Sequence, residues 1–204
     1  MIAAAPRVFV VDDDSSVRRS MTRLLSSAGY EVETFASGPD FLSRAPHDGP
    51  CCLVLDIRMP GPSGLDLQVA LAAAGRPMAI VFVSGHADVP MSVAAMKAGA
   101  IDLLTKPVDE HDLLVAIERA LAKNLDDAHV GEIQDRVATL TPREREVFER
   151  VVTGMLNKQI AFELGSAEKT VKVHRARVMQ KMRANSLAEL VRLADHVGLL
   201  GPKA

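Results

Sequence analysis

The chain has 204 residues, with 24 lysines and arginines against 26 aspartates and glutamates. This length accommodates one mid-sized domain and a second small one, since typical domains run to roughly 100–200 residues. Residues 1–140 carry 12 basic and 19 acidic side chains, whereas residues 141–204 carry 12 and 7. Only the carboxy-terminal part has the basic balance that favours nucleic acid, which indicates that this part alone meets nucleic acid.

The amino terminus and the cysteines indicate where the protein resides. Residues 1–11 carry one basic side chain and an apolar run broken by Pro6, which fits neither a signal peptide nor a membrane span. Cys51 and Cys52 are adjacent and open an apolar segment, so we interpret them as core residues in a reducing compartment rather than as a disulfide or metal site. Both patterns predict a soluble, cytoplasmic protein with no membrane contact.

Short apolar segments alternate with helical segments through residues 1–123. The predicted strands are 7–11, 31–35, 52–55, 79–83 and 101–104. The predicted helices are 15–28, 37–45, 63–73, 89–98 and one that starts at residue 109. Ser15 is the expected cap of the first helix, and Gly29 ends it in a left-handed conformation. The alternation predicts an α/β fold with a doubly wound, five-stranded parallel sheet in the order 2-1-3-4-5.

Polar residues follow the carboxyl ends of these strands, in the segments Asp12-Asp13-Asp14, Asp56-Ile57-Arg58-Met59-Pro60, Ser84-Gly85 and Lys106-Pro107. The carboxyl ends of parallel strands lie side by side, and ligands of open α/β folds bind there. Three carboxylates, a hydroxyl and an ammonium therefore converge on one edge of the sheet. This set and its order resemble the receiver domain of bacterial two-component response regulators, with Asp56 as the phosphoryl acceptor.

A metal ion is expected at this edge of the sheet. Carboxylates held close together repel unless a divalent cation neutralises them, and Mg²⁺ is the natural occupant because it is hard, prefers oxygen and keeps its waters. The resemblance implies that Asp13, Asp56 and the backbone carbonyl of Arg58 are direct ligands. It implies that Asp12 acts largely through water.

The resemblance also implies a phosphotransfer reaction with a sensor histidine kinase. Asp56 attacks a phosphohistidine of the kinase and becomes an aspartyl phosphate. Lys106 offsets charge on the transferring group, and Ser84 donates to a phosphoryl oxygen after transfer. His86 and Arg58 flank the site and are expected to set how fast water removes the phosphoryl group.

One residue departs from the receiver pattern. Leu103 stands where receivers commonly place a tyrosine or phenylalanine that follows the movement of the hydroxyl residue, so the aromatic part of that switch is absent.

A phosphohydrolase of the haloacid dehalogenase type would need an aspartate at position 58, which is arginine. We therefore expect no enzyme activity beyond self-phosphorylation and weak autodephosphorylation. A phosphorylation-independent binding protein is disfavoured by Asp13, Asp56, Ser84 and Lys106, although Leu103 leaves it open.

Residues 124–139 are predicted to be a linker between two domains. The segment is polar, and the three- and four-residue spacing of leucines before it would let the preceding helix run on. A linker helix and a coiled segment both fit. The expected organisation is a receiver domain over residues 1–123, the linker over 124–139, and a DNA-binding domain over 140–204.

The second domain begins with a capping box, in which Thr141 caps a helix, Pro142 takes its first position and Glu144 reaches back. Further helices are expected from Asn157, acting as a cap, to Leu164, and over 168–182 and 186–197. The motifs Leu-Thr-x-Arg-Glu-x-x-Val at 140–147, Asn-Lys-x-Ile-Ala at 157–161 and Thr-Val-Lys-x-His at 170–174, with Ser186-Leu187, resemble an all-α, four-helix LuxR-type helix-turn-helix domain. The order of both domains resembles the NarL/FixJ branch of response regulators.

The helix over residues 168–182 has the pattern of a DNA-recognition helix. At 100° per residue, Val171, Val178 and Met182 share a core face. The opposite face carries Lys169, Lys172, Val173, Ala176, Arg177 and Gln180. Such a face suits the major groove, where cations donate to guanine edges and small apolar residues meet thymine methyls.

The resemblance places the positions of Lys172, Val173 and Ala176 against bases, with Arg177 on the same face. Lys158, His174 and Arg175 are expected at the phosphate backbone. A basic helix face alone is usually only a solvated surface. The helix-turn-helix spacing and the basic balance of residues 141–204 favour DNA instead.

Together these patterns predict a DNA-binding response regulator that is phosphorylated on Asp56 and that controls transcription, with activation implied by the resemblance. Promoter DNA and a sensor histidine kinase are the expected partners, a homodimer is expected on phosphorylation, and RNA polymerase is a further candidate partner. The coupling is expected to run through the fourth and fifth helices and the fifth strand. A metal site built on His86, His111, His129 and His196 is not expected, because these histidines lack ligand spacing.

Overall fold

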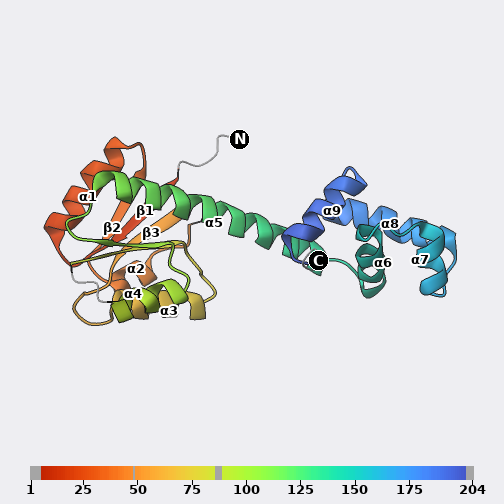
Figure 1. Cartoon of the computed structure of the whole chain (residues 1–204), viewed down its shortest axis with the longest axis horizontal. Coiled ribbons are helices and arrows are strands. Elements are labelled where there is room, and N and C mark those ends of the chain that lie inside the picture. Colours follow the sequence, from red (N-terminus) through yellow and green to blue (C-terminus); the bar gives the residue numbers. More distant parts are fainter. Residues whose placement is uncertain (1–5, 48, 86–88, 201–204) are drawn as a thin grey trace. The chain divides into compact units, whose positions relative to one another are not determined.

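The computed structural model describes residues 6–47, 49–85 and 89–200 (Figure 1). The chain forms two compact units, residues 1–126 and residues 127–204. The boundary between them lies inside the segment that was predicted to be a linker. Among the described residues, no helix is long and apolar enough to cross a membrane.

The first unit is built on a five-stranded parallel sheet. Its strands are β1 (Arg7–Val11), β2 (Glu31–Phe35), β3 (Cys51–Asp56), β4 (Ile80–Ser84) and β5 (Asp102–Thr105). All neighbouring strands are parallel, in the order β2-β1-β3-β4-β5, which confirms the predicted doubly wound topology. The last three strands each differ from the predicted bounds by one residue at both ends.

Helices cover both faces of this sheet. They are α1 (Ser15–Ser27), α2 (Gly38–Ser43), α3 (Gly64–Ala73), α4 (Val89–Lys97) and the first part of α5 (Glu110–Ala138). Figure 1 shows α1 and α5 on one face and α2, α3 and α4 on the other. Alternate residues of a strand point to opposite faces. Val8 and Val10 of β1 therefore pack in the core beneath α1 and α5, whereas Phe9 and Val11 pack on the opposite side.

The start of α1 differs from the prediction. The residue with an extended backbone is Asp14, whose carboxylate accepts a hydrogen bond from the backbone N–H of Ser16 at 2.7 Å. Ser15 is the first helical residue, so its assignment as the cap was wrong. Gly29 has the predicted left-handed backbone, with φ of +91°. Asp14 therefore caps α1, whereas Asp12 and Asp13 lie at the carboxyl edge of the sheet.

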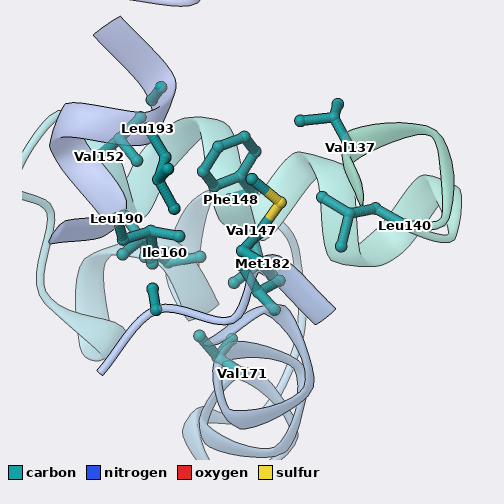
Figure 2. Close-up of a cluster of buried hydrophobic side chains, with 14 of the residues drawn as sticks. Val137, Leu140, Val147, Phe148, Val152, Ile160, Val171, Met182, Leu190 and Leu193 are labelled. Atoms are coloured by element: carbon teal, nitrogen blue, oxygen red, sulfur yellow. The ribbon is translucent and has the colours of Figure 1, made fainter. Parts of the chain in front are cut away.

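The second unit is a helical domain. It contains α6 (Pro142–Val152), α7 (Asn157–Glu163), α8 (Glu168–Met182) and α9 (Leu187–His196), which confirms the four predicted helices. Their apolar faces meet in one core, seen in Figure 2 around Phe148 and Met182. Both of these side chains are fully buried. The start of α7 also differs from the prediction. Leu156, and not Asn157, precedes the helix, and the N–H of Leu156 donates to the side chain of Gln159 at 2.8 Å.

The segment between the predicted domains is helical, because α5 continues without a break to Ala138. Its last turns belong to the second unit: Ile133 is fully buried and Val137 is 7% exposed, both within the core of the helical domain. Burial of these two side chains explains why a largely polar segment forms helix rather than coil, since packing of an apolar face stabilises a helix more than propensity does.

An ion pair between the buried Glu144 and the half-buried Lys181 joins α6 to α8. The side chain of Glu144 accepts a hydrogen bond from the backbone N–H of Thr141 at 2.9 Å, which completes the predicted capping box. The same carboxylate lies 2.6 Å from Nζ of Lys181, which also donates to the backbone carbonyl of Thr139 at 2.8 Å. The hydrogen bonds from Lys181 and Thr141 lower the pKa of Glu144 to about 2.

Replacing Glu144 with glutamine should destabilise the helical domain by about 1–3 kcal/mol at pH 7, because the half-buried Lys181 ammonium loses its charged acceptor. A lowered pKa gives stability that is present above the ordinary glutamate value of 4.5 and that is lost as the pH falls toward about 2. Urea unfolding of wild-type and variant proteins should therefore show a difference that shrinks between these two pH values. Glu149→Gln is the matched control, since its pair with Arg145 is exposed. An equal loss in both variants would contradict this assignment.

Candidate functional site

Three carboxylates meet at the carboxyl ends of β1 and β3. Asp12 and Asp13 directly follow β1, and Asp56 is the last residue of β3. One oxygen from each lies within 4.8 Å of the others, as a shared metal ion would require. Asp12 and Asp56 are buried and Asp13 is exposed, so the cluster opens to solvent on one side. Carboxylate oxygens at this spacing suit a hard divalent cation.

Lys106 lies between two of these carboxylates. Its Nζ is 2.7 Å from Oδ2 of Asp12 and 2.6 Å from Oδ2 of Asp56. Burial raises the pKa of Asp12, although the hydrogen bond from Lys106 opposes that rise. Burial also acts to lower the pKa of Lys106, but the hydrogen bonds to the two carboxylates raise it overall. One ammonium against three carboxylates leaves an excess of negative charge that a divalent cation would neutralise.

The remaining predicted residues of this site lie on neighbouring strands. Ser84 ends β4 and is fully buried, and its backbone carbonyl accepts from the N–H of Lys106 at 2.8 Å. The backbone N–H of Arg58 donates to Oδ1 of Asp56 at 3.1 Å, which places that segment against the carboxylate. The peptide bond between Lys106 and Pro107 is cis. His86 lies outside the described residues.

Two residues at this site were missed by the sequence analysis. An ideal Cβ on Gly64 would lie 2.3 Å from the backbone oxygen of Asp56, so only glycine fits where α3 begins. Arg18 on α1 donates from Nη1 to the backbone oxygens of Asp12 at 2.6 Å and Asp13 at 2.9 Å. The sequence signal for Gly64 is Ser63, a favourable helix cap directly before it. No local pattern identifies the backbone partners of Arg18.

Leu103 lies on β5, where it pairs with Phe82 of β4. Its side chain is half-buried and packs on the same core cluster as Phe82. The leucine thus fills the side of β5 toward α4.

The second unit presents the predicted basic face on α8. Val171, Val178 and Met182 are buried, as the helical periodicity predicted. The residues of the opposite face are all exposed: Lys169, Lys172, Val173, Ala176, Arg177 and Gln180. Lys172 makes an exposed ion pair with Glu168 at 3.0 Å, within one turn of the same helix. Such a pair is weak, so the ammonium stays available to another acceptor.

The residues expected at the phosphate backbone are less uniform. Lys158 is exposed in the first turn of α7. His174 and Arg175 are half-buried. Nη1 of Arg175 donates to Oδ1 of Asn157 at 3.1 Å, so Asn157 joins the two helices of the helix-turn-helix rather than capping its own helix.

Two histidines from distant segments of the chain lie in ring contact. The rings of His129 on α5 and His196 on α9 lie edge to face, with centroids 5.6 Å apart. Within the described part of the chain, no third histidine, cysteine or carboxylate joins them at ligand distance.

Family models match both units of the chain. The response regulator receiver domain matches residues 8–118, and the luxR family of bacterial regulatory proteins matches residues 138–194. The chain belongs to the NarL/FixJ family of response regulators. It is therefore a two-component response regulator that joins a receiver to a LuxR-type DNA-binding domain.

Similar proteins match along almost the whole regulator. Nodulation protein W of Bradyrhizobium diazoefficiens is 47% identical over 196 residues, covering 94% of this chain and 86% of that protein. The transcriptional regulatory protein FixJ of the same organism is 44% identical over 199 residues, covering 95% and 96%. The solved structure of response regulator StyR is 50% identical, with a TM-score of 0.72 and coverage of 94% of this chain and 99% of that chain.

Proposed function

We propose that phosphorylation of Asp56 by a sensor histidine kinase controls sequence-specific DNA binding by this regulator, and that the outcome is transcriptional activation. The observation that carries the proposal is the convergence of three carboxylates and Lys106 at one edge of the receiver sheet. A helix-turn-helix domain on the same chain supplies the response. We propose functional boundaries of 1–123 for the receiver, 124–139 for the linker and 140–204 for the DNA-binding domain.

Mg²⁺ is the proposed cofactor, because the acidic cluster consists of hard oxygen donors and carries excess negative charge. Asp13, Asp56 and the backbone carbonyl of Arg58 would hold it directly, and Asp12 through water. When bound, the ion neutralises charge on the transferring phosphoryl group.

The chain's own residues perform the transfer. A carboxylate oxygen of Asp56 attacks the phosphorus atom of the kinase phosphohistidine, the P–N bond breaks, and the electron pair leaves with the imidazole. The Lys106 ammonium, which lies 2.6 Å from Asp56, offsets negative charge beside the acceptor. The Ser84 hydroxyl donates to a phosphoryl oxygen of the product. Slow attack by water on the same phosphorus atom accounts for weak autodephosphorylation.

The response is proposed to pass through α4, β5 and α5. Phosphorylation remodels this face, favours a homodimer and releases inhibition of the DNA-binding domain. A dimer presents two recognition helices to two half-sites of promoter DNA. RNA polymerase is a proposed further partner, and a cytoplasmic location is part of the proposal because the regulator must reach the promoter.

The DNA contacts are proposed from the exposed face of α8. Lys172, Val173, Ala176 and Arg177 would face base edges in the major groove. Lys158, His174 and Arg175 would lie along the phosphate backbone. The exposure of the first four residues supports this assignment, whereas the bond from Arg175 to Asn157 limits the reach of that side chain.

Comparison of the whole chain with a carboxy-terminal fragment tests the proposed coupling. The fragment should begin at Asp127, because Ile133 and Val137 belong to the core of the helical domain and a fragment cut at Ala138 would lose both. At protein concentrations that span the dimer equilibrium, we expect the fragment to bind a selected DNA site more tightly than the unphosphorylated chain. Acetyl phosphate with Mg²⁺ should close that gap.

Two results would redirect the proposal. If the fragment binds no better than the unphosphorylated chain at saturating dimer, inhibition by the receiver is wrong and phosphorylation acts through dimerisation. If acetyl phosphate changes neither dimerisation nor DNA affinity, the chain is a phosphorylation-independent binding protein.

A further inference from the structure

The side chain of Arg18, on α1, forms hydrogen bonds with the backbone of the acidic segment Asp12-Asp13-Asp14. Its Nη1 donates to the carbonyl oxygens of two consecutive residues, Asp12 and Asp13, at 2.6 and 2.9 Å. The neighbouring arginine serves as a comparison. Within the described part of the chain, the one side-chain hydrogen bond of Arg19 is from Nη1 to Oγ of Ser15, in the same helix, at 3.2 Å. Arg18 is half-buried and Arg19 is exposed.

Other bonds hold the acidic segment at Asp12 and Asp14. The N–H of Asp12 donates to the carbonyl of Phe35 at 3.2 Å, and its carboxylate accepts from Lys106 at 2.7 Å. The side chain of Asp12 accepts from the N–H of Asp14 at 2.9 Å, and Asp14 itself caps α1. With both carbonyls also tied to Arg18, the peptide planes on either side of Asp13 are fixed relative to α1. Asp13 is the exposed member of the carboxylate cluster, so packing does little to hold it.

We propose that Arg18 is a positioning residue for the metal site, which it serves by fixing the backbone from which Asp12 and Asp13 reach Mg²⁺. This inference rests on the proposed function, because it concerns the same ion. Groups that orient metal ligands without touching the metal typically affect affinity by 10–100-fold when they are removed. Arg18 is thus predicted to set the Mg²⁺ affinity while remaining outside the reaction itself.

The direction in which Mg²⁺ affinity changes when Arg18 is replaced distinguishes a positioning role from a purely electrostatic one. A guanidinium close to a cation site repels Mg²⁺, so an arginine that acted only through its charge would weaken metal binding, and its removal would raise the affinity. An arginine that holds the ligand backbone has the opposite effect. Arg18→Met keeps much of the side-chain length and removes both hydrogen bonds, and Arg19→Gln removes one charge from the adjacent position.

The test measures Mg²⁺ binding to the unphosphorylated whole chain by calorimetry, without a phosphodonor. We expect Arg18→Met to bind Mg²⁺ about 10-fold more weakly than the wild type, and Arg19→Gln to bind as tightly or slightly more tightly. Arg18→Lys, which keeps the charge but loses the planar fork, should fall between wild type and Arg18→Met. Unchanged or raised affinity in Arg18→Met would overturn the proposal.

Amide hydrogen exchange in the metal-free protein gives a second readout that does not depend on Mg²⁺. The N–H of Asp14, which bonds to Asp12, should lose protection in Arg18→Met and keep it in Arg19→Gln. Unchanged protection of the β1 amides would show that the variant is folded. Absence of Mg²⁺ binding in the wild type would contradict the proposed cofactor, whereas unaltered Asp14 exchange in Arg18→Met would contradict the role of Arg18 alone.

Discussion

Asp56→Asn should abolish labelling of the protein by acetyl phosphate in the presence of Mg²⁺. The substitution keeps the size of the side chain at the end of β3 and removes the nucleophilic oxygen. Asp12 is also buried and lies 2.7 Å from Nζ of Lys106, so the variant distinguishes Asp56 from this second carboxylate. The measurement is the mobility shift of the phosphorylated form on a phosphate-affinity gel, together with loss of the label in mild alkali.

Lys106→Ala is the contrasting variant for this experiment. The ammonium lies beside the acceptor and does not attack, so labelling should persist while the phosphorylation-dependent gain in DNA affinity is lost. Stable labelling of Asp56→Asn at the same stoichiometry as the wild type would remove Asp56 as the acceptor. Loss of labelling in both variants would mean that Lys106 is required for the phosphoryl transfer itself.

Lys172→Ala should weaken binding to a selected DNA site by about 1–3 kcal/mol, or roughly 5- to 150-fold, if this side chain reads a guanine edge. The residue is exposed on the face of α8 that carries Val173 and Ala176. Its pair with Glu168 is exposed and lies within one helix, so breaking that pair should cost little stability. Fluorescence anisotropy on the selected site and on single-base variants measures the loss and its sequence dependence.

Lys158→Ala is the matched control, with the same charge change on α7. A phosphate contact weakens all sequences alike, and its removal should reduce the slope of affinity against salt concentration by about one. Equal losses for both variants on every DNA sequence would mean that Lys172 contacts only the backbone.

The sequence by itself determined the architecture and most of the proposed site. Apolar runs alternating with amphipathic segments specify a parallel sheet covered on both faces. The sheet order then follows from the few topologies that such an alternation allows. Residues that end parallel strands share one edge of the sheet, which predicts from sequence alone that Asp12, Asp56 and Lys106 lie together. The core face of α8 followed from helical periodicity in the same way.

Helix starts were determined less well, because several neighbouring residues can cap a helix and only the backbone conformation selects one. Both Asp14 and Ser15 are favourable caps, and the extended backbone falls on Asp14. Asn157 also has a favourable cap side chain, but that side chain accepts a hydrogen bond from Arg175, 18 residues away.

Only the tertiary structure decided the contacts that join distant segments. The linker could be helix or coil by local pattern, and it is helix because Ile133 and Val137 bury in the core of the second unit. Lys181 bonds to Glu144, which lies 37 positions away in the sequence. Arg18 donates to backbone carbonyls, which every residue has whatever its side chain. Periodicity in a sequence reports which face of an element is buried. It carries no information on which polar group of another element will lie within hydrogen-bond distance, because that depends on how the packed elements are placed in space.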